Sequence, residues 1–218
     1  MEQRSNRQAS PLPIFLFAFF AVWTIWAAFL VRFPEALGGD GLRAGVRLLV
    51  WVGSAWVFVR IVEGPPVLAH LGFLHQARKG LICGLLVSVV LAPLLNIAKH
   101  GFAIPHFVCP TTMAAWLNPI LTAPLAEEIL FRGVVFRFLS KRKSVWTGLV
   151  ISSVLFALCH LPYWWLSGAK SGANLWISLL EIAGVGALLC ALFQWKRSLW
   201  TPLIYHGANN FISIAFIW

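Results

Sequence analysis

Two neighbouring acids and a base lie inside an apolar stretch of the chain. Residues 123–133 read Ala-Pro-Leu-Ala-Glu-Glu-Ile-Leu-Phe-Arg-Gly and contain Glu127, Glu128 and Arg132. A charge at the centre of a membrane span costs about 2.5–3.5 kcal/mol on insertion scales, so a span keeps one where a partner or a function offsets the cost. Glu128 and Arg132 stand four residues apart, which predicts an ion pair on one helix face. Glu127 is turned by about 100° from Glu128 and need not share that partner.

Two histidines in other apolar stretches accompany these acids. Phe156 and His160 share a helix face at a spacing of four, and so do His206 and Asn210, with Asn209 beside them. Taken singly, such a histidine is typical of a membrane interface, and polar pairs of this kind also hydrogen-bond neighbouring helices. The acids and the base could equally form a structural ion cluster. Helix pairing alone, however, does not require a glutamate, two histidines and an asparagine on three separate spans.

This set of side chains is suited to the activation of water. A carboxylate can take a proton from water, and imidazole and amide N–H groups can stabilise the oxyanion that forms when the water attacks a carbonyl. No cofactor is needed for this chemistry. Zinc is the alternative because His and Glu bind it, but the H-E-x-x-H pattern is absent from the sequence.

The composition indicates that the elements positioning these residues cross a membrane. Sixty per cent of the 218 residues are hydrophobic, only 11% are charged, and the mean hydropathy is +0.81. A soluble domain could not cover its surface with so few charges, which excludes a soluble enzyme, a disordered tail and a free-standing nucleic-acid binder. The net charge of +10 is interpreted as a topology signal and not as a nucleic-acid surface.

Charge-poor stretches predict an all-α membrane protein with about seven transmembrane helices. A span needs about 20 mostly apolar residues. The predicted spans are 8–31 (apolar from Leu12), 46–62, 80–98, one within 100–138, one within 144–169 that ends near His160, 171–195 and 198–218. Segment 33–45 is predicted to be a loop. Segment 63–79 opens with the helix stop Gly64-Pro65-Pro66, and its remainder is expected on the membrane surface. The whole chain, 1–218, is expected to form one integral-membrane domain, with the site between helices 4, 5 and 7.

Lysines and arginines in the loops predict the orientation. With the N-terminus inside, the inner set is Arg4, Arg7, Arg78, Lys79, Arg137, Lys141, Arg142, Lys143, Lys196 and Arg197. The outer set is Arg32, Arg43, Arg47, Lys99 and Lys170. Cytoplasmic loops carry the excess of positive charge. Ten basic residues in the inner set against five in the outer set therefore favour a cytoplasmic N-terminus.

The three motifs, in order, resemble those of the CAAX prenyl protease and bacteriocin-processing family of intramembrane proteases. The motifs are Glu127-Glu128-x-x-x-Arg132, Phe156-x-x-x-His160 and His206-x-x-x-Asn210. The neighbouring Phe131-Arg132-Gly133, Gly184-x-Gly186 and Ser198-Leu199-Trp200-x-Pro202 agree with the resemblance, which covers about 119–215. The chain departs from the family pattern in its pair of asparagines at 209 and 210 and in Glu181.

The resemblance implies a glutamate-dependent hydrolase site in an all-helical membrane core. By position, Glu127 would be the general base, His160 would help to bind the water, and His206 and Asn210 would stabilise the oxyanion. Glu128 and Arg132 would support them, and no metal is implied. The expected substrate is a membrane-anchored peptide or protein tail, and the expected location is the plasma membrane of a prokaryote.

Two other classes of function compete with an intramembrane endopeptidase. One is a non-catalytic immunity or partner-binding protein of the same fold, but such a protein has no reason to retain Glu127, His160, His206 and Asn210 together. The other is a transporter with a proton relay, for which the chain is short and shows no inverted repeat.

Overall fold

The chain folds into a bundle of helices joined by short connections. The computed structural model describes residues 10–34, 40–101, 104–108 and 112–217. The helices outside the central segment described below are α1 (Leu12–Arg32), α2 (Asp40–Leu48), the π-helical η1 (Leu49–Gly53), α3 (Ser54–Val62), α4 (Val67–Leu71), α5 (Ala77–His100), α9 (Val145–Leu158), α10 (Leu161–Ser167), α11 (Gly172–Lys196) and α12 (Trp200–Ala215).

One continuous helical segment, 113–142, runs through the middle of the bundle. It consists of α6 (Met113–Leu117), η2 (Asn118–Thr122), α7 (Ala123–Glu128), η3 (Ile129–Phe136) and α8 (Arg137–Arg142). Its start is capped by Thr112, whose hydroxyl accepts a hydrogen bond from the Ala115 amide at 3.1 Å. Two of its parts, η2 and η3, are π-helical, a wider form that occurs mostly as single turns and often at functional sites.

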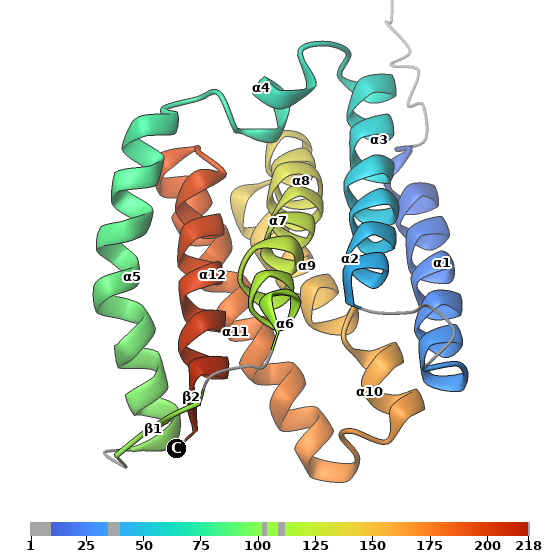
Figure 1. Ribbon diagram of the computed structural model, residues 1–218. Helices are drawn as coiled ribbons and strands as arrows, with labels where there is room; N and C mark the ends of the chain where they lie inside the picture. The colour runs from blue at the N-terminus through green and yellow to red at the C-terminus, as the bar shows by residue number, and fades with distance from the viewer. Residues whose placement is uncertain (1–9, 35–39, 102–103, 109–111, 218) are drawn as a thin grey trace, which may run out of the picture.

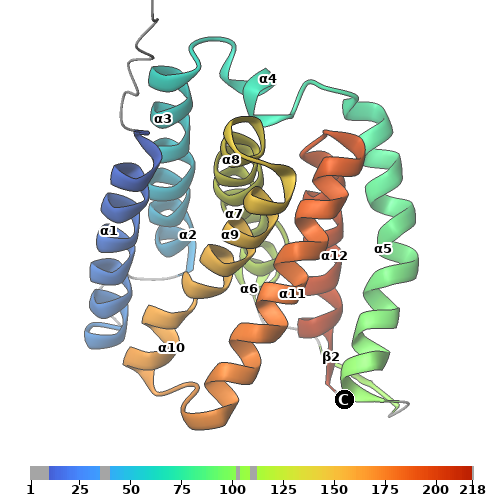
Figure 2. The ribbon, with the colours of Figure 1, turned by 180° about the vertical axis from the view of Figure 1, so that it is seen from behind.

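The other helices surround this central segment (Figures 1 and 2). α1 and the rod formed by α2, η1 and α3 lie on one side, and α5 and α12 pack together on the other. α9 and α11 pack against each other along a third side, and α10 turns outward to contact α1. β1 (His106–Phe107) and β2 (Phe216–Ile217) form a short antiparallel pair at the end of α12.

The all-helical membrane class is confirmed. Five helices of the described chain are long and apolar enough to span a membrane, namely Leu12–Arg32, Gly41–Val62, Ala77–His100, Val145–Ser167 and Gly172–Lys196. They correspond to predicted spans one, two, three, five and six. The central segment and α12, which correspond to predicted spans four and seven, do not fall in this set, so the count of seven stays a prediction.

One predicted loop is partly helical. Segment 33–45 was expected to be a loop because of its glycines, but α2 begins at Asp40 and includes Gly41 and Gly45. Glycine lowers helix stability by about 1 kcal/mol relative to alanine but does not forbid a helix. The helix formed by the apolar residues that follow can therefore continue toward the N-terminus through these glycines. The predicted stop at Gly64-Pro65-Pro66 is confirmed, since α3 ends at Val62.

Candidate active site

The central segment buries the two acids and the base together. Glu128 and Arg132 are fully buried, and Glu127 is 8% exposed. Arg132 Nη1 donates to Glu128 Oε1 at 3.0 Å, which confirms the predicted ion pair, and its Nη2 donates to the Gly186 carbonyl at 3.0 Å. The guanidinium carbon also lies 4.3 Å from the ring centroid of Phe156. Arg132 therefore ties the central segment to both α11 and α9.

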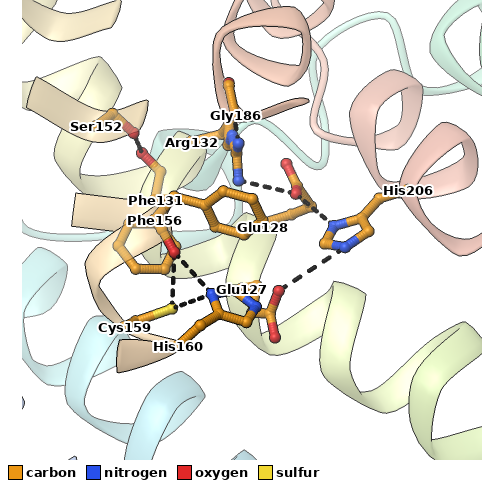
Figure 3. Close-up of polar contacts among 10 residues, drawn as sticks. All are labelled: Glu127, Glu128, Phe131, Arg132, Ser152, Phe156, Cys159, His160, Gly186 and His206. Carbon is orange, nitrogen blue, oxygen red and sulfur yellow. Dashed lines mark hydrogen bonds and ion pairs between the residues drawn. The ribbon is translucent and has the colours of Figure 1, made fainter. Parts of the chain in front are cut away.

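His206 on α12 lies between the two glutamates, as Figure 3 shows. Its Nδ1 is 2.8 Å from Glu128 Oε1, and its Nε2 is 3.8 Å from Glu127 Oε2. A carboxylate only accepts hydrogen bonds, so Nδ1 carries a proton and donates it to Glu128. Glu128 is thus engaged by a guanidinium and an imidazole, whereas Glu127 has only the longer contact with Nε2.

His160 comes to the site from the turn between α9 and α10. Its Nδ1 lies 3.0 Å from the Phe156 carbonyl, which requires a proton on Nδ1 and leaves Nε2 of the neutral ring as an acceptor. The Cys159 thiol contacts the same carbonyl at 3.0 Å and Nδ1 at 3.3 Å. The expected helical pairing of Phe156 with His160 is therefore present, and it fixes the orientation of the imidazole (Figure 3).

Asn210 lies one turn beyond His206 on the same helix. Its amide nitrogen donates to the Pro119 carbonyl at 2.9 Å and so links α12 to the π-helical turn η2. An amide nitrogen carries two protons, so one remains for another acceptor.

A cavity of about 730 Å³ brings the predicted residues to one place. Glu127, His160, His206 and Asn210 all line it, whereas Glu128 and Arg132 lie behind this wall. The structure thus collects side chains from the central segment, from the α9–α10 turn and from α12.

Five polar residues of the cavity were not among the predicted site residues, namely Asn96, Lys99, Glu181, Asn209 and Ser213. Asn96 and Lys99 reach it from α5, and Glu181 reaches it from α11. Lys99 Nζ lies 3.5 Å from a carboxylate oxygen of Glu181, an ion pair whose two side chains are both about half exposed. Asn96 is 4% exposed and donates to the Ala92 carbonyl at 2.8 Å. A polar residue within an apolar span, the signal used for Glu127, would also have selected Asn96.

The segment that carries the site matches a known family. Residues 109–212 match the family model of the type II CAAX prenyl endopeptidase Rce1-like proteins, which confirms the resemblance that the three motifs indicate. The chain is also similar to the UPF0177 protein YbdI of Lactococcus lactis subsp. lactis (strain IL1403), with 24% identity over 105 residues, 48% of this chain and 50% of the relative. The chain thus spans about half the length of the curated relative it matches, and no solved structure matches it.

Proposed function

We propose that this chain, whose segment 109–212 is similar to the Rce1-like endopeptidases, is an intramembrane endopeptidase that hydrolyses a peptide bond in a membrane-anchored peptide or protein tail. The observation that carries the proposal is the unequal engagement of the two glutamates. Glu128 is held by Arg132 Nη1 at 3.0 Å and by His206 Nδ1 at 2.8 Å, whereas Glu127 faces the cavity. One carboxylate serves the structure, and its neighbour remains free for proton transfer.

In the proposed reaction Glu127 is the general base. It takes a proton from a water whose other contact is Nε2 of His160, and the water oxygen bonds to the carbonyl carbon of the substrate. The carbonyl oxygen becomes an oxyanion, which accepts hydrogen bonds from the free amide proton of Asn210 and from His206 Nε2 in the form that carries both ring protons. When the C–N bond breaks, Glu127 returns the proton to the leaving nitrogen, and the products are an amine and a carboxylic acid, which then loses its proton to solvent.

Glu128 and Arg132 act as positioning residues in this scheme. The Glu128 carboxylate fixes the His206 ring through Nδ1, which directs Nε2 toward the cavity wall that Glu127 occupies. Holding a ring in one orientation is what makes an oxyanion donor effective, because the geometry is set before charge develops.

The scheme uses no metal. In the described part of the chain no group of three or more His, Cys, Asp or Glu side chains is arranged to hold a metal ion. The test is to treat purified protein with a chelator, measure its metal content and assay peptide cleavage. We expect unchanged turnover. Stoichiometric zinc that is lost together with activity and restores it on addition would contradict the scheme.

The decisive experiment compares Glu127→Gln with Glu128→Gln. Glutamine keeps the size and most hydrogen bonds but cannot take a proton, so Glu127→Gln should fold normally and lose about 10²- to 10⁴-fold in turnover. Glu128→Gln weakens the contacts with Arg132 and His206 and should lower stability at least as much as rate. The measurement is product formation from a reporter peptide, normalised to folded protein.

Two results would overturn the proposal in different ways. Near-normal turnover in Glu127→Gln, combined with a stably folded but inactive Glu128→Gln, would transfer the role of base to Glu128. If neither change affects cleavage in any assay, the non-catalytic immunity or partner-binding function replaces the enzyme.

A further inference from the structure

A second cavity lies at the end of the bundle that contains α4 and the last turn of α8, at the top of Figure 1. It has a volume of about 440 Å³, and its wall shares no residue with the active-site cavity. The spans Val145–Ser167 and Gly172–Lys196 have one end each here, where Trp146 is 75% exposed and Trp195 is 59% exposed. Tryptophan rings are enriched where a bilayer meets water, which places the cavity at the level of the lipid headgroups.

The wall of this cavity is cationic. Arg137, Lys141 and Arg197 line it together with His75, and no acid of the described chain does. Glu63, which lies outside the wall, is 3.1 Å from Lys141 Nζ and 3.2 Å from Arg137 Nη2. Arg197 forms no ion pair with any described residue. One carboxylate is therefore set against three permanent positive charges, which leaves an excess of positive charge in the cavity.

Several hydrogen-bond donors of the wall have no acceptor. Among the described residues, Arg137 Nη1 and Ser140 Oγ are buried atoms without a hydrogen-bond partner. The half-buried Gln194 amide and the exposed Arg197 guanidinium also line the cavity, and neither donates to a group in the described part of the chain. Buried polar groups are nearly always hydrogen-bonded, so unpaired donors around a cationic cavity indicate a ligand with several acceptor oxygens.

Arg197 has an uncommon backbone conformation at the end of α11. Its φ is 51°, in the left-handed region, and its amide donates to the Phe193 carbonyl at 2.6 Å. This region favours glycine at a helix end and is uncommon for other residues, so an arginine here carries a conformational cost. A position that glycine often fills thus supplies a guanidinium that no carboxylate of the described chain neutralises.

We propose that the second cavity binds an anionic phosphate ester, whose oxygens accept hydrogen bonds from the Arg197 guanidinium and the Gln194 amide. Arg137 and Lys141 add positive charge to the same wall. A phosphate group combines negative charge with several acceptor oxygens, and a guanidinium can donate to two of them at once. The level of the cavity favours the headgroup of an anionic phospholipid over a soluble ester. This inference concerns a site apart from the proposed peptidase and does not depend on cleavage.

The test measures the binding of short-chain lipids to the full-length protein in detergent by native mass spectrometry. The probe is dihexanoyl-phosphatidylglycerol, compared with dihexanoyl-phosphatidylcholine, which has the same chains and no net charge. The anionic lipid should occupy one saturable site about tenfold or more tightly than the neutral one, because hydrogen bonds between charged groups contribute about that factor. Occupation of the site should also raise the thermal midpoint, since the ligand binds only the folded protein.

Three variants and a control locate the site. Arg197→Gln should remove most of the preference for the anionic lipid, and Arg197→Lys should restore part of it. Gln194→Met keeps the size of the side chain and the net charge but removes the donor, so it should weaken binding of phosphatidylglycerol about three- to tenfold. Arg60→Gln is the matched control, because Arg60 is an exposed arginine near the end of α3 that does not line the cavity. It should bind the lipid as wild type does.

Three results would overturn the site. The first is equal affinity of wild type for the two lipids. The second is undiminished affinity for phosphatidylglycerol in either Arg197→Gln or Gln194→Met. The third is an equal loss in Arg197→Gln and Arg60→Gln, which would reduce the effect to the diffuse attraction between a basic surface and anionic lipid.

Glycerol 3-phosphate identifies the source of the phosphate. If it does not displace bound phosphatidylglycerol, the site takes a lipid headgroup, as we expect. If it displaces the lipid at a similar concentration, and its own binding depends on Arg197 and Gln194, the phosphate site is retained and its ligand is a soluble ester.

Discussion

At the scale of single residues, the site depends on which groups the buried Arg132 guanidinium contacts. Arg132 is fully buried and donates to Glu128 and to the Gly186 carbonyl while lying over the Phe156 ring. Its contacts go to Glu128 and not to Glu127, although the two acids are adjacent. Glu128 is therefore paired with the buried guanidinium, whereas Glu127 lies beside the cavity with only the 3.8 Å contact to His206 Nε2.

Removing Arg132 should destabilise the protein as well as inactivate it. Arg132→Ala leaves the Glu128 carboxylate buried with only His206 as a partner, and breaking a buried ion pair typically costs about 3–5 kcal/mol. We expect a lower thermal midpoint in detergent and a lower yield of folded protein, both measured against wild type. Arg60→Ala, an exposed arginine on α3, is the matched control and should change stability by about 0.5 kcal/mol or less. Normal stability of Arg132→Ala would show that Glu128 does not depend on this pair.

The sequence predicts the local part of this arrangement and not the long-range part. The pairing of Glu128 with Arg132 follows from their spacing, because residues four apart share a helix face. The contact of His206 with Glu128 joins helices that are far apart in the chain. Helical spacing relates only residues a few positions apart, so it does not predict this contact. Arg43 and Arg47 were placed only in the outer set of loop cations, because their sequence neighbours do not show that they line a cavity with Glu127.

At the scale of elements, glycines bring the site helices into contact. A Cβ atom built on Gly207 would lie 2.5 Å from the Ile120 carbonyl oxygen, so α12 can touch η2 only where that side chain is missing. The contact places His206, the residue before Gly207, at the level of the glutamates. Gly186 has the same role on α11, where a Cβ would lie 3.1 Å from the Phe156 ring.

Gly207→Ala should therefore separate α12 from the central segment. The new methyl group would meet backbone, which cannot yield as a flexible side chain can, and overpacking of this kind costs about 1–3 kcal/mol. We expect a lower thermal midpoint together with reduced turnover, because the Asn210 hydrogen bond to Pro119 crosses the same contact. Gly45→Ala is the control: nothing lies within 4 Å of its Cβ position, and alanine favours a helix. A fully stable and active Gly207→Ala would contradict the close approach.

Hydropathy predicts the long helices and misses their irregular parts. α1, α5 and α11 begin and end within a few residues of the predicted spans, because each is a charge-poor run of about the length of a bilayer. The π-helical turns η2 and η3 were not predicted, since a change in the hydrogen-bonding period leaves no trace in composition. These turns contain or border Pro119, Glu128 and Arg132, so the unpredicted geometry lies at the site.

At the scale of the whole molecule, the basic loops gather at one end. The ends of α3, α8 and α11 and the start of α5 lie together there, at the top of Figure 1. At this end the Glu63 carboxylate contacts three groups at 3.1–3.2 Å, namely His70 on α4 and both Arg137 and Lys141 on α8. Glu63 thereby links α4 and the central segment to the end of α3.

This cluster predicts a loss of stability in acid. Burial raises the pKa of the Glu63 carboxyl, but the hydrogen bond from Lys141 and the charges of Arg137, Lys141 and His70 outweigh it and hold the pKa below 4.5. A carboxyl whose pKa is lowered by folding stabilises the protein above its unfolded pKa, and that contribution disappears as the pH falls through the folded pKa. Glu63→Gln should lower the thermal midpoint by a few degrees at pH 7. Between pH 5 and pH 3 the midpoint of this variant should fall less than the midpoint of wild type. Parallel midpoint curves for the two proteins would rule out this contribution.

The separation of charges between the two ends also makes the orientation testable. Residue 143, with its basic neighbours, and residue 169 lie at opposite ends of the span Val145–Ser167, and both are exposed. Because cytoplasmic loops are the basic ones, Lys143→Cys should react with a membrane-impermeant thiol reagent only from the cytoplasmic side, and Ala169→Cys only from the outer side. The parent chain, with its own cysteines, gives the background. The reverse pattern would place the N-terminus outside, and labelling of both sites from one side would mean that this segment does not cross the bilayer.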